Sequence, residues 1–126
     1  MFLSKIRQKH IILSTREKRL RSVPPFRSLK KEDCMKEKVI ENKIKAYLKT
    51  IDGLYFFKEH GGLYGTAGVP DIICCYKGKF IAFEVKAPDG KTTVLQDATI
   101  KRIRGAGGSA YVVRSVEEVK SIINSK

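Results

Sequence analysis

Three charged residues near the middle of the chain have the types and spacing of a hydrolytic metal site. Asp71 is followed thirteen residues later by Glu84, and Lys86 comes two residues after that. Two apolar runs, residues 72–76 and 80–86, are joined by a short turn around Gly78, which predicts a β-hairpin. If the hairpin folds about Gly78, position 71 lies opposite position 85, give or take one residue. Asp71 then comes within reach of both Glu84 and Lys86.

This group of residues is suited to phosphoryl chemistry. Two carboxylates beside an ammonium are costly to bury in an apolar sheet without further partners. Mg²⁺ or Mn²⁺, in contrast, binds carboxylates, a backbone carbonyl and water. Asp71, Glu84 and the carbonyl of Val85 are therefore the predicted metal ligands, and Lys86 would orient the attacking water or help to deprotonate it. The alternative is a surface hairpin with one salt bridge between Lys86 and a carboxylate.

The elements that must position this group follow from the hydrophobic periodicity. We expect helices over residues 37–51 and 94–104 and after Ser115, with strands over 54–58, 72–76, 80–86 and 110–113. The order α-β-β-β-α-β-α predicts an α/β domain with helices packed on a sheet. Gln96 shares one side of its helix with Ile100 and Ile103, so its amide is expected near the end of the strand that carries Glu84.

Aromatic and cysteine side chains in the strands are expected to be core residues because they fall within apolar strand runs. A small RNA-binding protein that stacks bases on exposed rings is disfavoured for the same reason. The aromatic residues are Tyr55, Phe56, Phe57, Phe80 and Phe83, and the cysteines are Cys74 and Cys75.

The motifs closely resemble those of the PD-(D/E)XK nuclease superfamily, in which Pro-Asp precedes Glu-x-Lys. The run from Glu37 to Ile123 resembles the small stand-alone VRR-NUC nucleases of phages, which are similar to Holliday junction resolvases. The resemblance implies a restriction-endonuclease-like core with a mixed β-sheet flanked by helices. Its matching positions are Glu41, Lys58, residues 68–71, residues 84–86 and Gln96.

Further roles are implied by this resemblance. A glutamate of the first helix reaches the metal site in the family, and Glu41 matches it best, with Glu37 as the alternative. Gln96 would hydrogen-bond a water or carboxylate of the site, or would simply cap its helix. Four cations would contact DNA or would only be solvated, namely Lys58, Lys101, Arg102 and Arg104.

The composition points to a polyanionic partner. The 126 residues include 26 Lys and Arg against 13 Asp and Glu, for a net charge of +13. Residues 1–34 hold ten of the basic and three of the acidic residues, and we expect them to be a flexible basic N-terminal extension before a nuclease domain at 35–126. A targeting segment for an organelle, or a mis-started extension before Met35, are the alternatives. No apolar run approaches the length of a membrane span.

The leading hypothesis is a Mg²⁺- or Mn²⁺-dependent endonuclease that hydrolyses DNA. The resemblance implies a homodimer that acts on branched or four-way junction DNA in replication, repair or recombination, in the cytoplasm of a bacterial or phage-infected cell. A sequence-specific restriction-type nuclease is disfavoured because little length is left for target recognition. The alternative from another class is a non-catalytic nucleic-acid-binding module that keeps a nuclease fold. The intact set of Asp71, Glu84 and Lys86 argues against that alternative.

Overall fold

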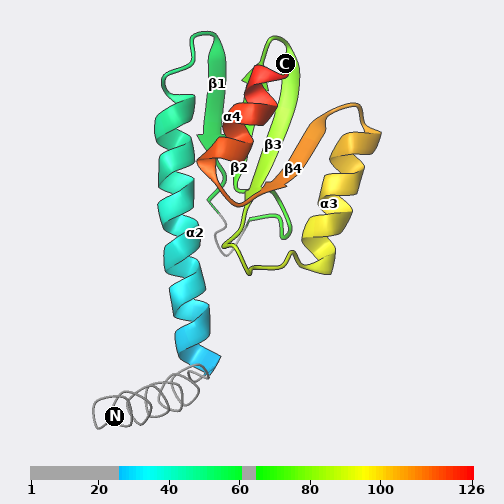
Figure 1. The fold of residues 1–126 in the computed structure, drawn as a ribbon. Helices are drawn as coiled ribbons and strands as arrows, with labels where there is room; N and C mark the ends of the chain where they lie inside the picture. Colours follow the sequence, from blue (N-terminus) through cyan, green and yellow to red (C-terminus); the bar gives the residue numbers. More distant parts are fainter. Residues whose placement is uncertain (1–25, 61–64) are drawn as a thin grey trace, which may run out of the picture. The chain divides into compact units, whose positions relative to one another are not determined.

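A computed structural model describes residues 26–60 and 65–126 of the chain, and its sheet belongs to one compact unit, Asp33–Lys126. The described elements are α2 (Phe26–Leu48), β1 (Leu54–Lys58), β2 (Ile72–Tyr76), β3 (Lys79–Val85), α3 (Val94–Gly105), β4 (Ser109–Val113) and α4 (Val116–Asn124) (Figure 1). The predicted order α-β-β-β-α-β-α is confirmed, and each strand lies within one residue of its predicted bounds.

The first helix differs most from its prediction. It begins at Phe26 instead of residue 37 and ends at Leu48 instead of Ile51. The prediction followed the apolar stripe, whereas the upstream turns hold helix-favouring residues such as Lys30, Lys31 and Glu32 that form no apolar stripe. Part of the predicted extension is therefore helical, and residues 1–25 lie outside the described part of the chain.

The sheet is mixed, in the order β1-β2-β3-β4. The β1–β2 and β2–β3 pairs are antiparallel, and β3 runs parallel to β4. A two-residue turn, Lys77-Gly78, closes the β2–β3 hairpin, and both residues have positive φ, 51° and 74°, as a type I′ turn requires. Ile72 pairs with Phe83, so position 71 lies opposite position 84, one residue from the predicted register.

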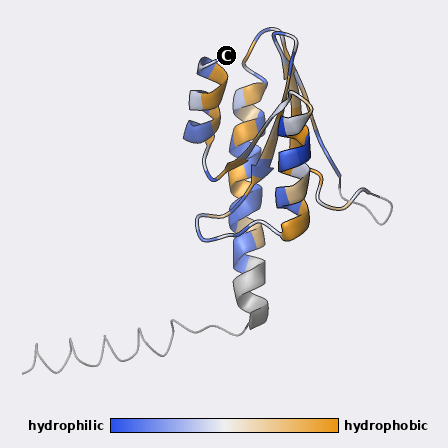
Figure 2. Ribbon diagram, turned by 90° about the vertical axis from the view of Figure 1, so that its right-hand side faces the viewer, coloured by the Kyte–Doolittle hydropathy of each residue, from blue (hydrophilic) through white to orange (hydrophobic). Residues whose placement is uncertain are grey.

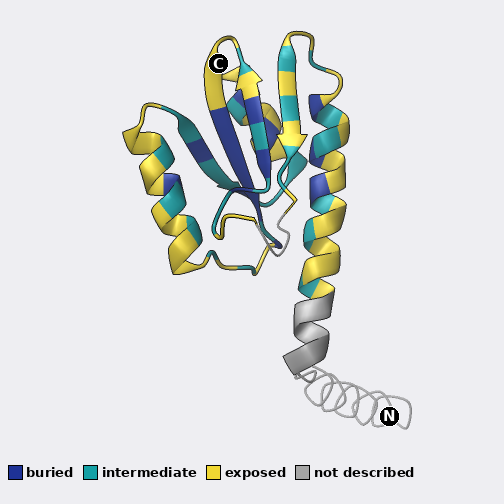
Figure 3. Ribbon diagram, turned by 180° about the vertical axis from the view of Figure 1, so that it is seen from behind, coloured by how far each residue is buried: buried dark blue, intermediate teal, exposed yellow. Residues whose placement is uncertain are grey.

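Helices cover the two faces of the sheet unequally. One face packs against α2 and α4, through a core cluster that includes Ile44, Phe83 and Val119. The other face carries a smaller cluster, in which Ile100 of α3 packs on Ala82 and Ala110. Figure 3 views the sheet from the α3 side, with α3 beside β4 and no described helix in front of β1.

The expectation that all five strand aromatics are core residues is wrong for three of them. Phe83 is fully buried and Phe56 packs against the main core. Tyr55, Phe57 and Phe80 point to the α3 face and are 69%, 44% and 45% exposed. Cys74 is likewise buried, whereas its neighbour Cys75 is exposed on that same face. Strand alternation, with one face only partly covered, accounts for the difference.

The helices that pack on the sheet are amphipathic. In Figure 2 hydrophobic and hydrophilic residues alternate along α2, and the residues that it buries include Ile44 and Leu48. Within the described part of the chain, no helix has the length and apolar character needed to cross a membrane.

Candidate active site

Asp71, Glu84 and Lys86 come together at the end of the β2–β3 hairpin. Asp71 Oδ2 accepts a hydrogen bond of 2.8 Å from the backbone N–H of Val85, which holds the carboxylate against β3. Glu84 Oε1 lies 3.3 Å from Lys86 Nζ and accepts a 2.7 Å hydrogen bond from Gln96 Nε2. Glu84 is 2% exposed, so this charged group lies inside the protein surface.

The second carboxylate oxygen of Glu84 marks where a cation would fit. Oε2 is buried and has no hydrogen-bond partner among the described residues. A buried carboxylate oxygen normally has a partner, because desolvation without one is costly. Asp71 has one oxygen bonded to Val85 and a second oxygen left over. The chemistry of these oxygens and of the Val85 carbonyl fits Mg²⁺ or Mn²⁺, which bind oxygen ligands.

Among the described residues, no third carboxylate, histidine or cysteine joins Asp71 and Glu84 to form a metal-binding cluster. Within residues 26–60 and 65–126, no group of three or more His, Cys, Asp or Glu side chains is arranged to hold a metal ion. A metal at the hairpin would therefore rest on two carboxylates and would need backbone, water or substrate oxygens to complete its shell.

The electrostatics favour a bound cation. Burial, reinforced by the neighbouring charge of Asp71, raises the pKa of Glu84 from its ordinary 4.5 to about 7, against the opposing effect of Lys86. Burial also raises the pKa of Asp71, while the N–H of Val85 and the charge of Lys86 oppose the shift. Neighbouring carboxyl groups with raised pKa values are costly to ionise together. A divalent cation between them would stabilise the ionised form of both.

The Gln96 side chain makes two hydrogen bonds, one in the cap of its own helix and one to Glu84. It stands at the third position of α3, where it forms a capping box with Thr93: the Thr93 hydroxyl accepts from the Gln96 N–H, and Gln96 Oε1 accepts from the Thr93 N–H at 2.9 Å. Its Nε2 then points at Glu84. Gln96 therefore caps its helix and also hydrogen-bonds Glu84, and its role in a catalytic site stays a prediction. The sequence signal for the box is the spacing Thr-x-x-Gln.

Replacing Gln96 with Leu should therefore affect stability and activity together. We expect a loss of about 1–2 kcal/mol in the free energy of unfolding, because half of the capping box goes and Glu84 loses a donor. Any catalytic activity that depends on Glu84 should fall about 10- to 100-fold. Thr93→Ala is the matched control, since it weakens the same cap by about 1 kcal/mol and leaves the Gln96–Glu84 bond intact. Equal activity in the two variants would contradict a positioning role for Gln96.

Glu41, the predicted glutamate of the first helix, is 8% exposed and lies near the pair without joining it. Its carboxylate lies 2.9 Å from Lys58 Nζ and 3.1 Å from Lys45 Nζ. Burial alone would raise the pKa of Glu41, but the bonds from Lys58 and Lys45 outweigh it and lower that pKa. The charge of Glu41 still contributes to the raised pKa of Asp71, so the two groups sense each other.

Glu37, the alternative to Glu41, contacts the other side of the site. Its Oε1 lies 3.4 Å from the backbone N of Ala87, the residue after Lys86, and its charge contributes to the raised pKa of Glu84. Glu37 and Glu41 are four residues apart, so both carboxylates lie on one side of α2. This spacing is the feature of the sequence that indicates that both can approach the site.

The predicted DNA-contacting cations differ in their surroundings. Lys58 is engaged by Glu41, as described above. Arg104 donates from Nε and from one terminal nitrogen to the carbonyl of Ala110, at 3.0 and 2.7 Å, which ties the end of α3 to β4. Lys101 and Arg102 are exposed on α3. Their contact with DNA stays a prediction.

Gly68 determines the path of the backbone that leads to Asp71. Its φ is 81°, and a Cβ atom there would lie 2.8 Å from Cγ of Leu95 and 2.9 Å from the Leu95 carbonyl oxygen. Both the backbone conformation and the space beside α3 therefore require glycine. Three residues later the chain reaches Asp71, so this contact positions the carboxylate relative to the helix that carries Gln96.

We expect Gly68→Ala to destabilise the protein by roughly 2–4 kcal/mol, from the left-handed backbone and the clash with Leu95. Gly53→Ala is the matched control, because Gly53 also has positive φ, 76°, and nothing lies within 4 Å of its added Cβ. It should cost only about 1 kcal/mol. Chemical denaturation of both variants separates the two contributions, and equal losses would show that the Leu95 contact is unimportant.

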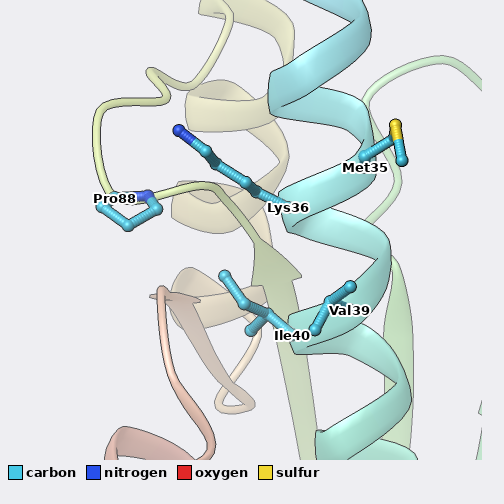
Figure 4. Close-up of a pocket in the computed structure, with 5 residues that line it drawn as sticks. All are labelled: Met35, Lys36, Val39, Ile40 and Pro88. Carbon is cyan, nitrogen blue, oxygen red and sulfur yellow. The ribbon is translucent and has the colours of Figure 1, made fainter.

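A surface pocket lies on α2 near the loop that follows Lys86. Met35, Lys36, Val39, Ile40 and Pro88 line it, and its volume is about 330 Å³ (Figure 4). Its walls are apolar apart from the Lys36 side chain, and none of the lining residues is a carboxylate. The pocket is therefore distinct from the candidate metal site in its chemistry.

Comparisons with known proteins bear on the fold. No protein-family model matches the chain, and no curated protein matches it. A solved structure described as a VRR_NUC domain superposes with a TM-score of 0.60 at 24% sequence identity. The match covers 71% of this chain and 95% of that one. The predicted α/β fold is thus confirmed: the four-stranded mixed sheet and its helices have the fold of a VRR_NUC domain.

Proposed function

We propose that this protein is a divalent-metal-dependent nuclease that hydrolyses phosphodiester bonds in DNA. The observation that carries the proposal is the buried Glu84 carboxylate, held directly opposite Asp71 and beside Lys86, with one oxygen that has no partner among the residues that the structure describes. The VRR_NUC-like fold and the net charge of +13 support it, since a nuclease must bind a polyanion.

Each residue of the site has a defined task in this proposal. Mg²⁺ or Mn²⁺, held by Asp71, Glu84 and the carbonyl of Val85, would act as a Lewis acid on the phosphoryl oxygens. Lys86 orients the attacking water, whose oxygen bonds to phosphorus as one P–O ester bond breaks and the leaving oxygen gains a proton. The Lys86 ammonium also offsets negative charge that develops on the phosphoryl oxygens. Gln96 keeps the Glu84 carboxylate in place through its 2.7 Å hydrogen bond.

The finer features of the proposal come from the resemblance to VRR-NUC nucleases. We propose branched or four-way junction DNA as the substrate, a homodimer as the active form, and a role in replication, repair or recombination in a bacterial or phage-infected cell. Glu41 completes or tunes the site, and Lys58, Lys101, Arg102 and Arg104 contribute to DNA binding. The placement of Lys101 and Arg102 on the exposed surface of α3 supports their part.

The proposal is tested by cleavage of labelled four-way junction, flap, single-stranded and linear duplex DNA with Mg²⁺, Mn²⁺ or EDTA. Cleavage should require the metal and should vanish in EDTA. Mn²⁺ should also raise the melting temperature of the protein without DNA, because a ligand that binds the folded state stabilises it. A folded protein that binds DNA but cuts no substrate with either metal would instead be the non-catalytic binding module.

A further inference from the structure

Two exposed aromatic rings lie side by side on the same face of the sheet as the carboxylate pair. Tyr55 and Phe57 alternate with half-buried positions along β1, and their ring centroids are 6.4 Å apart. Phe57 pairs with Ile73 of β2, and Tyr55 pairs with Cys75. Residues 71, 73 and 75 share one face of β2, so the two rings and Asp71 belong to the same surface.

The rings lie close to the candidate active site. The β1–β2 ladder continues to Asp71, whose carbonyl accepts from the Glu59 N–H at 2.9 Å. Phe57 therefore lies on the strand next to Asp71. It is displaced from Asp71 by two residues, about 7 Å, along the strand direction. Tyr55 lies about 7 Å further along. A strand of nucleic acid whose phosphate reaches the carboxylates would have its neighbouring bases over these rings.

The described residues leave this part of the sheet uncovered. The cluster under α3 includes Ala82, Ala110 and Ile73 but neither ring, and Figure 3 shows no described helix in front of β1. Tyr55 is 69% and Phe57 44% exposed, which is costly for two adjacent aromatic side chains unless a partner covers them.

The charge near the rings has both signs. Glu59 follows Phe57 by two residues on the same face and is acidic, whereas an exposed arginine of α3 is basic. Leu95 of α3 lies against the backbone at Gly68, and Arg102 follows two helical turns later on the same side of α3. Arg104 points the other way, to the carbonyl of Ala110 on β4. Arg102 is thus exposed on the side of α3 that carries Leu95 and away from β4. The net charge of the chain, +13, favours nucleic acid as the occupant of this face.

We infer that Tyr55 and Phe57 form a stacking platform for unpaired nucleotides that adjoin the phosphate held at Asp71 and Glu84. This inference rests on the proposed nuclease function and narrows its substrate to nucleic acid with a single-stranded segment beside the cut. Exposed rings stack on any base and give affinity without reading sequence. In a continuous duplex the bases are paired and stacked on each other, so the platform selects flaps, overhangs and open branch points.

The first test measures binding in the full chain with Asp71→Asn, which separates binding from cleavage. The double variant Tyr55→Leu, Phe57→Leu keeps apolar side chains and removes both rings, and Tyr55→Phe keeps the ring as a control. Fluorescence anisotropy with a single-stranded oligonucleotide should show at least about a tenfold loss of affinity in the double variant. Tyr55→Phe should stay within about twofold, and affinity for a blunt duplex should fall far less than affinity for the single strand.

A second measurement detects the contact directly. The chain has no tryptophan, so Tyr55→Trp introduces a single reporter on the platform. Its fluorescence should be quenched on addition of the single-stranded oligonucleotide, as expected for base stacking. Ser121→Trp is the matched control, since Ser121 is exposed on α4, which covers the opposite face of the sheet. Equal quenching at the two positions would overturn the platform.

The outcomes distinguish this inference from the proposed function. If the wild type cuts DNA but the double variant binds single strands as tightly as wild type, the platform is wrong and the nuclease stands. If the wild type cuts nothing but ring removal abolishes single-strand binding, the nuclease is wrong and the platform stands as a binding site. If the wild type is a dimer that dissociates in the double variant, with single-strand affinity unchanged, the rings form a self-association surface and the inference is overturned.

Discussion

Asp71→Asn protein should bind DNA as tightly as wild type and cut it at least about 10³-fold more slowly. The substitution removes the charge that a divalent cation needs, while the amide oxygen of asparagine can still accept the 2.8 Å bond from the Val85 N–H. The hairpin should therefore keep its geometry, and the loss should come from chemistry and not from unfolding. Mn²⁺ should no longer raise the melting temperature of the variant to the wild-type extent.

Single-turnover cleavage with enzyme in excess is the appropriate measurement, because it separates the chemical step from binding and product release. Asp52→Asn is the matched control: Asp52 is exposed in the turn between α2 and β1, and the same chemical change there should leave the rate within about twofold. An Asp71→Asn protein that retains a tenth of wild-type activity would remove Asp71 from the metal site.

Glu84→Gln should have two effects of opposite sign, abolishing cleavage while stabilising the metal-free protein at alkaline pH. The pKa of Glu84 is about 7 in the folded protein, against an ordinary 4.5. Between these values the folded state binds more protons than the unfolded chain, so the free energy of unfolding falls as pH rises through the window. The raised pKa of Asp71 acts in the same direction. Glutamine removes the Glu84 contribution and still accepts from Gln96.

Thermal melts in EDTA from pH 5 to 8.5 should show the wild type losing stability as pH rises and the variant losing less, a difference of several degrees at pH 8. Mn²⁺ should restore wild-type stability most strongly at pH 8, where it no longer competes with protons, and should have little effect on the variant. Glu117→Gln, on the exposed first turn of α4, is the control. Identical pH profiles for wild type and Glu84→Gln would contradict the burial argument.

The sequence predicted the centre of this site better than its surroundings. The hairpin followed from two apolar runs around Gly78, and it placed Asp71, Glu84 and Lys86 together with an error of one residue in register. That error arose because the turn was read as three residues, Lys77 to Lys79, whereas Lys79 already pairs with Tyr76. A non-glycine residue with φ of 51°, such as Lys77, carries little sequence signal.

The partners of long charged side chains could not be predicted from the sequence. Glu41 was expected at the metal site, and its partners in the structure are Lys45 and Lys58. Arg104 was grouped with DNA-contacting cations, and it hydrogen-bonds the Ala110 carbonyl. Periodicity gives the side of a helix on which a residue lies, but the partner that a flexible charged chain selects depends on tertiary packing.

The exposed aromatics illustrate a second limit. Alternation along β1 assigns Tyr55 and Phe57 to one face and Phe56 to the other, and the structure agrees with that assignment. Whether this face of β1 is covered depends on the position of the crossover helix. That helix, α3, packs over Ala82 and Ala110 and not over β1. No local pattern in the strand itself contains that information.

The two-residue turn at Lys77-Gly78 also has a consequence for the order of folding. Asp71 and Glu84 belong to one hairpin, so closing a short loop is enough to bring both carboxylates together. Parallel pairing of β3 with β4 requires a crossover through α3, a more distant contact that forms more slowly. We therefore expect the two charges to meet before the helix that brings Gln96 is docked. Metal present during folding would bind the hairpin early and relieve their repulsion, so refolding should be faster with Mn²⁺ than in EDTA.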